Sequence, residues 1–194
     1  TTWDICAYDK ASLRSTGKID LPRMRNGNLD AEFFAVYVAQ RPLTEENYRK
    51  ARESADQLFR LIDKMLQTYP DVIRLATTPE DAYANEKQGL LSAYIGVENG
   101  FALGHDLNRL AELHQRGVRY ITLCHTRNND ICDSSTDDSG PLYHGLSDFG
   151  RTLIAEMNRL GILVDVSHAS DETFYQALEV SKAPIFASHS CVRA

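Results

Sequence analysis

The chain has 194 residues, 43% of them hydrophobic and 25% charged, which is enough for one globular domain with a sizeable core. Its net charge is -6 without clusters of basic residues, which argues against a nucleic-acid partner. No stretch approaches the roughly 18 consecutive apolar residues of a membrane span, and the N-terminal region lacks the basic-then-apolar pattern of a signal peptide. We expect no membrane span. The compartment stays open, cytoplasmic or exported, with any export signal upstream or absent.

The first half of the chain is expected to alternate strands and helices. Aromatic and β-branched residues before position 40 predict a strand, and apolar residues at helical spacing after Thr44 predict a long helix that stops before Pro70. In chain order we expect an irregular stretch over 1–28, a strand over 29–38, a helix from Thr44 to Pro70, an extended piece over 72–76, and a helix from Thr78 to about Gly89.

Residues 90–97 form an apolar run that is interrupted only by Ser92 and Gly96. Such a run predicts a strand buried on both faces, and strands of this kind belong to parallel sheets. Glu98 follows where the strand ends. In α/β folds the carboxyl ends of parallel strands are where chemistry is placed, so Glu98 is a candidate functional residue.

Three later apolar segments also end in a residue type that binds metals or transfers protons. Helices separate these segments, and a loop of about twenty residues interrupts the second half, a length that is usually functional or disordered. We expect strands over 118–124, 162–167 and 183–188, which end at His125, His168 and His189, helices over 107–117, 147–160 and 171–180, and the loop over 126–145.

The alternation of strand and helix predicts the α/β class with parallel strands, as a single catalytic domain over residues 1–194. A truncated barrel is favoured over an open five-stranded sheet. In either case the strand ends lie at one rim, where two imidazoles and a carboxylate are a usual ligand set for catalytic zinc. A lone histidine is more often a packed, hydrogen-bonded group than a ligand. Here, however, four successive strands each end in a residue type that binds metal or transfers protons, which favours a site. The candidates are Glu98, His125, His168 and His189.

The remaining histidines and the cysteines offer weaker signals. His105, His114 and His144 fall in helices or loops and receive no role. The four cysteines have no CxxC spacing, and small buried side chains are their expected role. Cys124 and Cys191 each adjoin a candidate histidine, so a mixed Cys/His zinc site remains an alternative. The four are Cys6, Cys124, Cys132 and Cys191.

Five ordered segments together carry a family resemblance. They are Ile95-Gly-Val-Glu-Asn-Gly, Arg119-Tyr-Ile-Thr-Leu-Cys-His, Gly145-Leu-Ser-Asp-Phe-Gly, Met157-Asn-Arg-Leu-Gly-Ile-Leu-Val-Asp-Val-Ser-His and Pro184-Ile-Phe-Ala-Ser-His-Ser. From about Lys18 to its last residue the chain resembles the membrane (renal) dipeptidases, peptidase family M19, which are zinc metallopeptidases. The resemblance implies a (β/α)8 TIM barrel of the metal-dependent hydrolase type, of which this chain supplies roughly the second to sixth strands. It also implies two zinc ions and hydrolysis of dipeptides, including some with a D-residue.

The resemblance also implies a role for each candidate. Glu98 matches the carboxylate that bridges both zinc ions, and His168 and His189 match the imidazole ligands of one ion. His125 matches the histidine that contacts substrate and supports the tetrahedral intermediate. The implied reaction is attack on the scissile peptide carbonyl by a hydroxide that bridges the metals.

The chain also departs from the family pattern. The His-x-Asp pair that ligates the second zinc has no counterpart, and it would have to precede Thr1. The late aspartate and the arginine that holds the substrate carboxylate would lie beyond Ala194, and Arg193 does not match that arginine's position. We therefore expect one full ligand set for zinc and half of a second.

The leading hypothesis is a zinc-dependent dipeptidase whose partner is a small dipeptide. The rim residues do not distinguish this activity from opening of a lactone, a phosphoester or a β-lactam. A non-catalytic degenerate homologue is a further alternative, which the missing ligands favour. Because an incomplete barrel leaves strand edges and apolar surface uncovered, we also expect a homo-oligomer.

Overall fold

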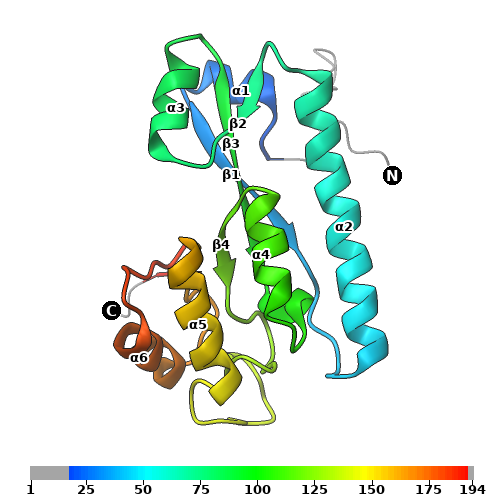
Figure 1. The fold of residues 1–194 in the computed structure, drawn as a ribbon, viewed down its shortest axis with the longest axis vertical. Helices are drawn as coiled ribbons and strands as arrows, with labels where there is room; N and C mark the ends of the chain where they lie inside the picture. Colours follow the sequence, from blue (N-terminus) through cyan, green and yellow to red (C-terminus); the bar gives the residue numbers. More distant parts are fainter. Residues whose placement is uncertain (1–17, 192–194) are drawn as a thin grey trace. The chain divides into compact units, whose positions relative to one another are not determined.

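The computed structural model describes residues 18–191, so the irregular stretch expected before Lys18, Cys6 and Arg193 lie outside the described residues. Contacts divide the chain into two compact units (Figure 1). The first unit comprises Thr1–Phe34 and Arg60–Tyr94, and the second comprises Ala35–Phe59 and Ile95–Ala194.

The first element among the described residues of the first unit is a short helix, where the sequence analysis expected irregular chain. Asp20 caps this helix by accepting a hydrogen bond from the Arg23 amide through Oδ1 at 2.8 Å. Pro22 lies in the first turn, where a missing N–H is tolerated. The elements that contribute to this unit are α1 (Leu21–Asn26), β1 (Ala31–Tyr37), α2 (Glu45–Thr68), β2 (Ile73–Leu75), α3 (Pro79–Glu86) and β3 (Leu91–Glu98).

Strand β2 pairs with the first half of β3 in parallel, with Ile73 opposite Leu91. Helix α3 connects the two strands, and its expected start at Thr78 is confirmed. Thr78 Oγ1 accepts the Asp81 amide, and the Asp81 carboxylate accepts the Thr78 amide, which completes a capping box.

The second unit carries the parallel sheet that positions the candidate site. β3 pairs with β4, and β4 pairs with β5, both in parallel, so Glu98, Thr122 and Asp165 lie side by side at the carboxyl ends. The full strand order is β1-β3-β4-β5, with β2 also paired to β3. The further elements are η1 (Gly100–Leu103), α4 (Asn108–Gln115), β4 (Val118–Thr122), α5 (Asp148–Leu160), β5 (Leu163–Asp165) and α6 (Asp171–Val180).

This arrangement confirms the α/β class with parallel strands, but a further expected element, besides the irregular stretch that contains α1, differs from the structure. The strand expected over 183–188 forms only an isolated parallel bridge between Asp165 and Phe186. The Phe186 amide donates to the Val164 carbonyl, and the Val166 amide donates to the Phe186 carbonyl. The segment therefore begins to pair with β5 but has no further ladder bonds of its own.

Helices α4 and α5 pack against β4 and β5 in the second unit, and α6 packs against α5. The core consists of fully buried strand and helix residues such as Ile121, Val164 and Leu153. Gly96 is required in β3, because a Cβ there would lie 2.1 Å from the Tyr120 ring of β4. The Tyr120 ring therefore packs over the backbone of β3, and the parallel pairing of β3 with β4 places their carboxyl ends at one edge.

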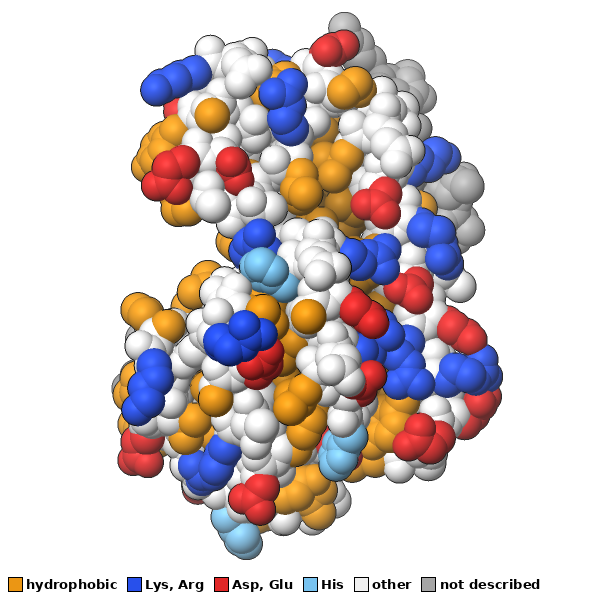
Figure 2. Space-filling model, viewed as in Figure 1, with side chains coloured by type: hydrophobic (Ala, Val, Ile, Leu, Met, Phe, Trp, Pro, Cys, Tyr) orange, Lys and Arg blue, Asp and Glu red, His pale blue; other side chains and the backbone are white. Residues whose placement is uncertain are grey.

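On the face shown in Figure 2, basic and acidic side chains are interspersed, without a continuous basic surface. The alternation is clear on α2, where Arg49 pairs with Glu46 and Glu53, and Lys50 pairs with Glu46. Within residues 18–191, none of the helices has the length and apolar character needed to cross a membrane.

Candidate metal centre

Glu98 is the last residue of β3, and its backbone is fixed on both sides. The Glu98 carbonyl accepts a hydrogen bond from the Val38 amide at 3.1 Å. Asn99 follows in a backbone conformation unusual for a residue with a side chain, with φ at 84°. The Asn99 side chain is buried, and its Nδ2 donates a hydrogen bond to the Val38 carbonyl at 3.0 Å. Its Oδ1 accepts one from the backbone amide of Phe101 at 3.1 Å. These bonds direct the Glu98 side chain toward the ends of β4 and β5.

His125 lies three residues beyond the end of β4. Its carbonyl accepts a hydrogen bond from Ser134 Oγ at 2.5 Å, which ties it to the long loop. Its ring stands against the Tyr37 ring, with centroids 4.9 Å apart. The ring nitrogen Nδ1 is buried and has no hydrogen-bond partner among the described residues, so the other nitrogen carries the polar contacts of this side chain.

His168 follows β5 in a left-handed backbone conformation, with φ at 68°. Its carbonyl accepts a hydrogen bond from the Ser135 amide at 2.8 Å, which stabilises this strained geometry. The turn aims the imidazole back at Glu98. His189 reaches the same point from the segment after α6, where its amide donates to Ser167 Oγ at 3.1 Å.

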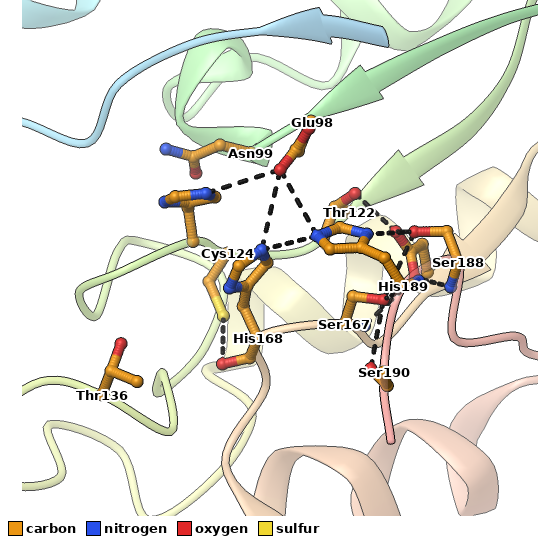
Figure 3. A network of polar contacts seen from close by, with 12 residues as sticks. Glu98, Asn99, Thr122, Cys124, Thr136, Ser167, His168, Ser188, His189 and Ser190 are labelled. Atoms are coloured by element: carbon orange, nitrogen blue, oxygen red, sulfur yellow. Dashed lines mark hydrogen bonds and ion pairs between the residues drawn. The ribbon is translucent and has the colours of Figure 1, made fainter. Parts of the chain in front are cut away.

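The three candidate imidazoles approach one carboxylate oxygen of Glu98. Figure 3 shows His168 and His189 directed at this carboxylate. The Nε2 atoms of His125, His168 and His189 lie 3.4, 3.6 and 3.5 Å from Glu98 Oε1. The Nε2 atoms of His168 and His189 are 2.8 Å apart. Acceptor lone pairs that face one another across such distances are unfavourable unless a proton or a cation lies between them.

The donor set fits a zinc ion. The ligand atoms of Glu98, His168 and His189 all lie within 4.8 Å of one another. Zinc bonds of about 2.0–2.2 Å at tetrahedral angles place neighbouring ligand atoms roughly 3.3–3.6 Å apart. The two carboxylate–imidazole distances, 3.6 and 3.5 Å, match this range, whereas the two Nε2 atoms, at 2.8 Å, lie closer together than two ligands of one zinc ion would. Nitrogen and carboxylate donors are the types that zinc takes in catalytic sites. His125 lies against the same oxygen, but it is not part of the three-residue group.

Electrostatics favour the neutral form of His168. Partial burial lowers the pKa of its imidazole, and the neighbouring His125 and His189 lower it further against the opposing effect of Glu98. A neutral imidazole retains the lone pair that a metal requires.

The cysteines lie differently from the candidate ligands. Cys124 Sγ is directed at two backbone carbonyls, those of Asp133 at 3.8 Å and His168 at 3.7 Å. Cys132 is buried, and burial raises the pKa of its thiol well above the usual range. The metal-ligand group found among the described residues contains no cysteine. Cys124 and Cys132 are buried, as expected, whereas Cys191 is exposed, so the expected role of a small buried side chain is wrong for Cys191.

The loop over 126–145 is ordered by its own buried aspartate. The Asp133 carboxylate accepts hydrogen bonds from the amides of Leu142, Tyr143 and Gly145. A cavity of about 380 Å³ lies between this loop and the start of α6, and none of the four candidate residues lines it.

Sequence reasoning missed the polar groups behind the four side chains. Asp165 and Ser188 form hydrogen bonds beneath His189, and Asn129 pairs with Asn99 beneath Glu98. Asp165 carried a usable signal, because an acidic residue between valines in a buried strand requires hydrogen-bond partners.

A model of the membrane dipeptidases, peptidase family M19, matches residues 3–194. The chain belongs to this family. Dipeptidase tcpJ from Claviceps purpurea is 36% identical to this M19 chain over 179 residues, which cover 90% of the chain and 42% of tcpJ.

Solved structures agree with this membership in the dipeptidase family. The probable dipeptidase PvdM from Pseudomonas aeruginosa superimposes with a TM-score of 0.86 at 28% identity, covering 94% of this chain and 48% of that one. A metallo peptidase from Rhodobacter sphaeroides was solved with a phosphinate mimic of the dipeptide L-Ala-D-Ala. It superimposes with a TM-score of 0.81 at 26% identity, and the match covers 91% of this chain and 57% of that one. The chain thus spans about half the length of these relatives, and its parallel α/β fold is that of part of the family's barrel.

Proposed function

We propose that this protein is a zinc-dependent dipeptidase in which Glu98, His168 and His189 hold a metal ion and His125 contacts the substrate. The observation that carries the proposal is the approach of three imidazole nitrogens to one oxygen of Glu98, within 3.4–3.6 Å. Membership in the dipeptidase family supports the choice of reaction, and the nitrogen and carboxylate donors support zinc.

Each side chain contributes a separate property. Glu98 offers a negative charge that neutralises part of the ion's charge, and the two metal-binding imidazoles offer neutral nitrogen donors. Zinc, when bound, supplies the Lewis acidity that activates water and polarises the scissile carbonyl. His125 lies beside these groups with Nε2 facing the same point, where it can donate a hydrogen bond to the substrate oxygen on which negative charge develops.

The proposed substrate is a small dipeptide, with D-residues accepted at the carboxyl end. The relative from Rhodobacter sphaeroides supports this choice, since its structure holds a mimic of L-Ala-D-Ala. A panel of an L-L dipeptide, an L-D dipeptide, a lactone, a phosphoester and a carbapenem tests the choice. We expect the protein to cleave the dipeptides. If it cleaved only the lactone, the phosphoester or the carbapenem, the proposed dipeptidase activity would be wrong, and the activity observed would be the function.

Glu98→Gln tests the metal role in the protein at its full natural length. The amide keeps the shape but loses the charge, and loss of outer-shell partners alone typically costs 10–100-fold, so we expect activity to fall by more than roughly 100-fold. Bound zinc, measured by elemental analysis, is expected to fall as well. Glu179→Gln makes the same chemical change on the exposed face of α6 and should leave both unchanged. Retained hydrolysis in Glu98→Gln would remove Glu98 from the mechanism.

A further inference from the structure

Asp165 is a fully buried carboxylate for which the proposed reaction has no direct use. It is the last residue of β5 and accepts four hydrogen bonds. Oδ2 accepts from the hydroxyls of Thr122 and Ser188, both at 2.6 Å. Oδ1 accepts from the amides of Ser167 and Ser188, at 3.1 and 3.0 Å. A buried carboxylate with four donors has a specific structural role.

The two amide bonds position both metal-binding histidines. Ser167 immediately precedes His168, and Ser188 immediately precedes His189. One oxygen of Asp165 therefore fixes the backbone just before each of the two imidazoles, although they come from segments separated by α6. Their Nε2 atoms lie 2.8 Å apart at the site.

The two hydroxyl bonds have a definite direction. Burial by itself would raise the pKa of Asp165, but hydrogen bonds from Ser188 and Thr122 outweigh it and the pKa is lowered. The carboxylate is therefore ionised at neutral pH, and an ionised carboxylate only accepts hydrogen bonds. Ser188 must then direct its single hydroxyl proton at Asp165.

The direction of this bond decides the tautomer of His189. Ser188 Oγ lies 2.7 Å from His189 Nδ1. Figure 3 marks this contact between the two labelled residues with a dashed line. Because the serine proton is already donated to Asp165, the serine oxygen is the acceptor and Nδ1 carries the proton. In the neutral ring Nε2 is then left with its lone pair, directed at Glu98 Oε1 and His168.

We propose that Asp165 and Ser188 form a hydrogen-bonded relay that fixes His189 in the Nδ1-protonated tautomer and thereby prepares Nε2 to bind the metal. Both are positioning residues, since neither touches the proposed ion. The relay depends on the proposed function in one respect only, which is that zinc is the ion that His189 Nε2 binds. The tautomer itself follows from the hydrogen bonds and can be measured without metal.

Ser188→Ala is the primary test, and Ser190→Ala is its matched control. Both serines are exposed and flank His189, but Ser190 Oγ contacts Ser167 Oγ at 3.3 Å and does not contact the ring. In the protein at its full natural length, zinc affinity is measured by competition with a chelator at fixed pH. Loss of an outer-shell partner is expected to weaken zinc binding by roughly 10–100-fold in Ser188→Ala. Ser190→Ala should bind as wild type, and Ser188→Thr, which keeps the hydroxyl, should restore affinity.

The tautomer is read from imidazole ¹⁵N shifts of the metal-free protein. Wild type is expected to show His189 protonated at Nδ1. In Asp165→Asn, the new amide group donates to Ser188 Oγ, which frees the serine proton for Nδ1 and moves the ring proton to Nε2. A similar carboxylate-to-amide change inverts the histidine tautomer in serine proteases. Ser188→Thr should keep the wild-type shifts.

The results separate the relay from the proposed function. An Nε2-protonated His189 in wild type, or unchanged zinc affinity in Ser188→Ala, would overturn the relay even if the enzyme cleaves dipeptides. If wild type binds no zinc, the proposed function fails, and the ¹⁵N shifts of wild type and Asp165→Asn alone decide the relay.

Discussion

Two residues next to the proposed chemistry have backbone conformations that side chains rarely adopt. Asn99 and His168 have φ values of 84° and 68°. Each such residue costs of order 1–3 kcal/mol and persists only where surrounding contacts hold it. For Asn99 those contacts are four hydrogen bonds, to Val38, Gln40, Phe101 and Asn129. The backbone strain is located where it turns Glu98 and His168 toward each other.

Substitution of Asn99 separates the strain from the hydrogen bonds. Asn99→Ala keeps the strained φ and leaves buried partners unsatisfied, so we expect a loss of about 2 kcal/mol or more in the free energy of unfolding. Asn99→Gly loses the same bonds but removes the strain, so it should be the more stable variant of the two by about 1 kcal/mol. Urea unfolding measures both. An alanine variant more stable than the glycine variant would show that φ at this position carries no strain.

At the level of single residues, the sequence predicted the side chains that face the site but not those that hold them. Glu98, His125, His168 and His189 could be found because strand ends converge in parallel sheets. Ser188 and Asn99 could not, because their roles depend on partners 23 and 61 positions away along the chain, Asp165 and Val38. Asp165 carried the signal of an acidic residue in a buried strand, but not the identity of its partners. Residue type and local spacing carry no information about such pairs.

Helix α5 and the long loop fit together through the first turn of the helix. Ser147 Oγ accepts the Gly150 amide at 2.9 Å and donates to the Asp130 carbonyl at 2.6 Å. A Cβ on Gly150 would lie 2.1 Å from the Ile131 carbonyl oxygen. Glycine at this helical position therefore allows the loop backbone to lie directly against α5.

Gly150→Ala should reverse the usual effect of this substitution. In an exposed helix interior, alanine is better than glycine by about 1 kcal/mol. Here the methyl group must displace the loop backbone, and overpacking typically costs about 1–3 kcal/mol, so we expect lower stability and lower dipeptidase activity. Ala155→Gly, on the exposed side of α5, is the control, because its change in the free energy of unfolding reflects only the difference in helix propensity between alanine and glycine. A stabilised Gly150→Ala protein would mean that the loop moves away without cost.

At the level of elements, the sequence predicted helices with clear caps well. It predicted poorly the short helix α1 and the segment over 183–188. Helix α6 was expected over 171–180 and runs from Asp171 to Val180. Helix α1 was missed because its stability depends on Asp20 and on a proline that can also break helices. The strand over 183–188 was expected from composition, but a strand is defined by its partners, and only Phe186 pairs with β5.

On the scale of the whole molecule, the proposed ion joins three segments of the second unit that are far apart in the sequence. Glu98 ends β3, His168 follows β5, and His189 lies on the segment after α6. That last segment is mostly exposed, and the bonds that hold it include those of Phe186 to β5, of Ser188 to Asp165 and of the His189 amide to Ser167. Convergence of the ligands was predictable from parallel strands, whereas their separations were not, since those depend on packing. The expected single-domain organisation and homo-oligomer remain predictions.

Removal of zinc should therefore loosen one segment more than the rest of the protein. An ion that binds only the folded state stabilises it by about 2.7 kcal/mol at 100 times its Kd, so zinc should raise Tm and a chelator should lower it. Amide hydrogen exchange should become faster over 186–191 after chelation, while the buried face of α5 stays protected. Mg²⁺, which prefers oxygen ligands, should not replace zinc in either measurement. The Glu98→Gln variant should show, even with zinc present, the lower Tm and the faster exchange over 186–191 that are expected for the wild-type protein after chelation. Equal exchange over 186–191 with and without zinc would mean that His189 is not a ligand, because no other proposed ligand lies on that segment.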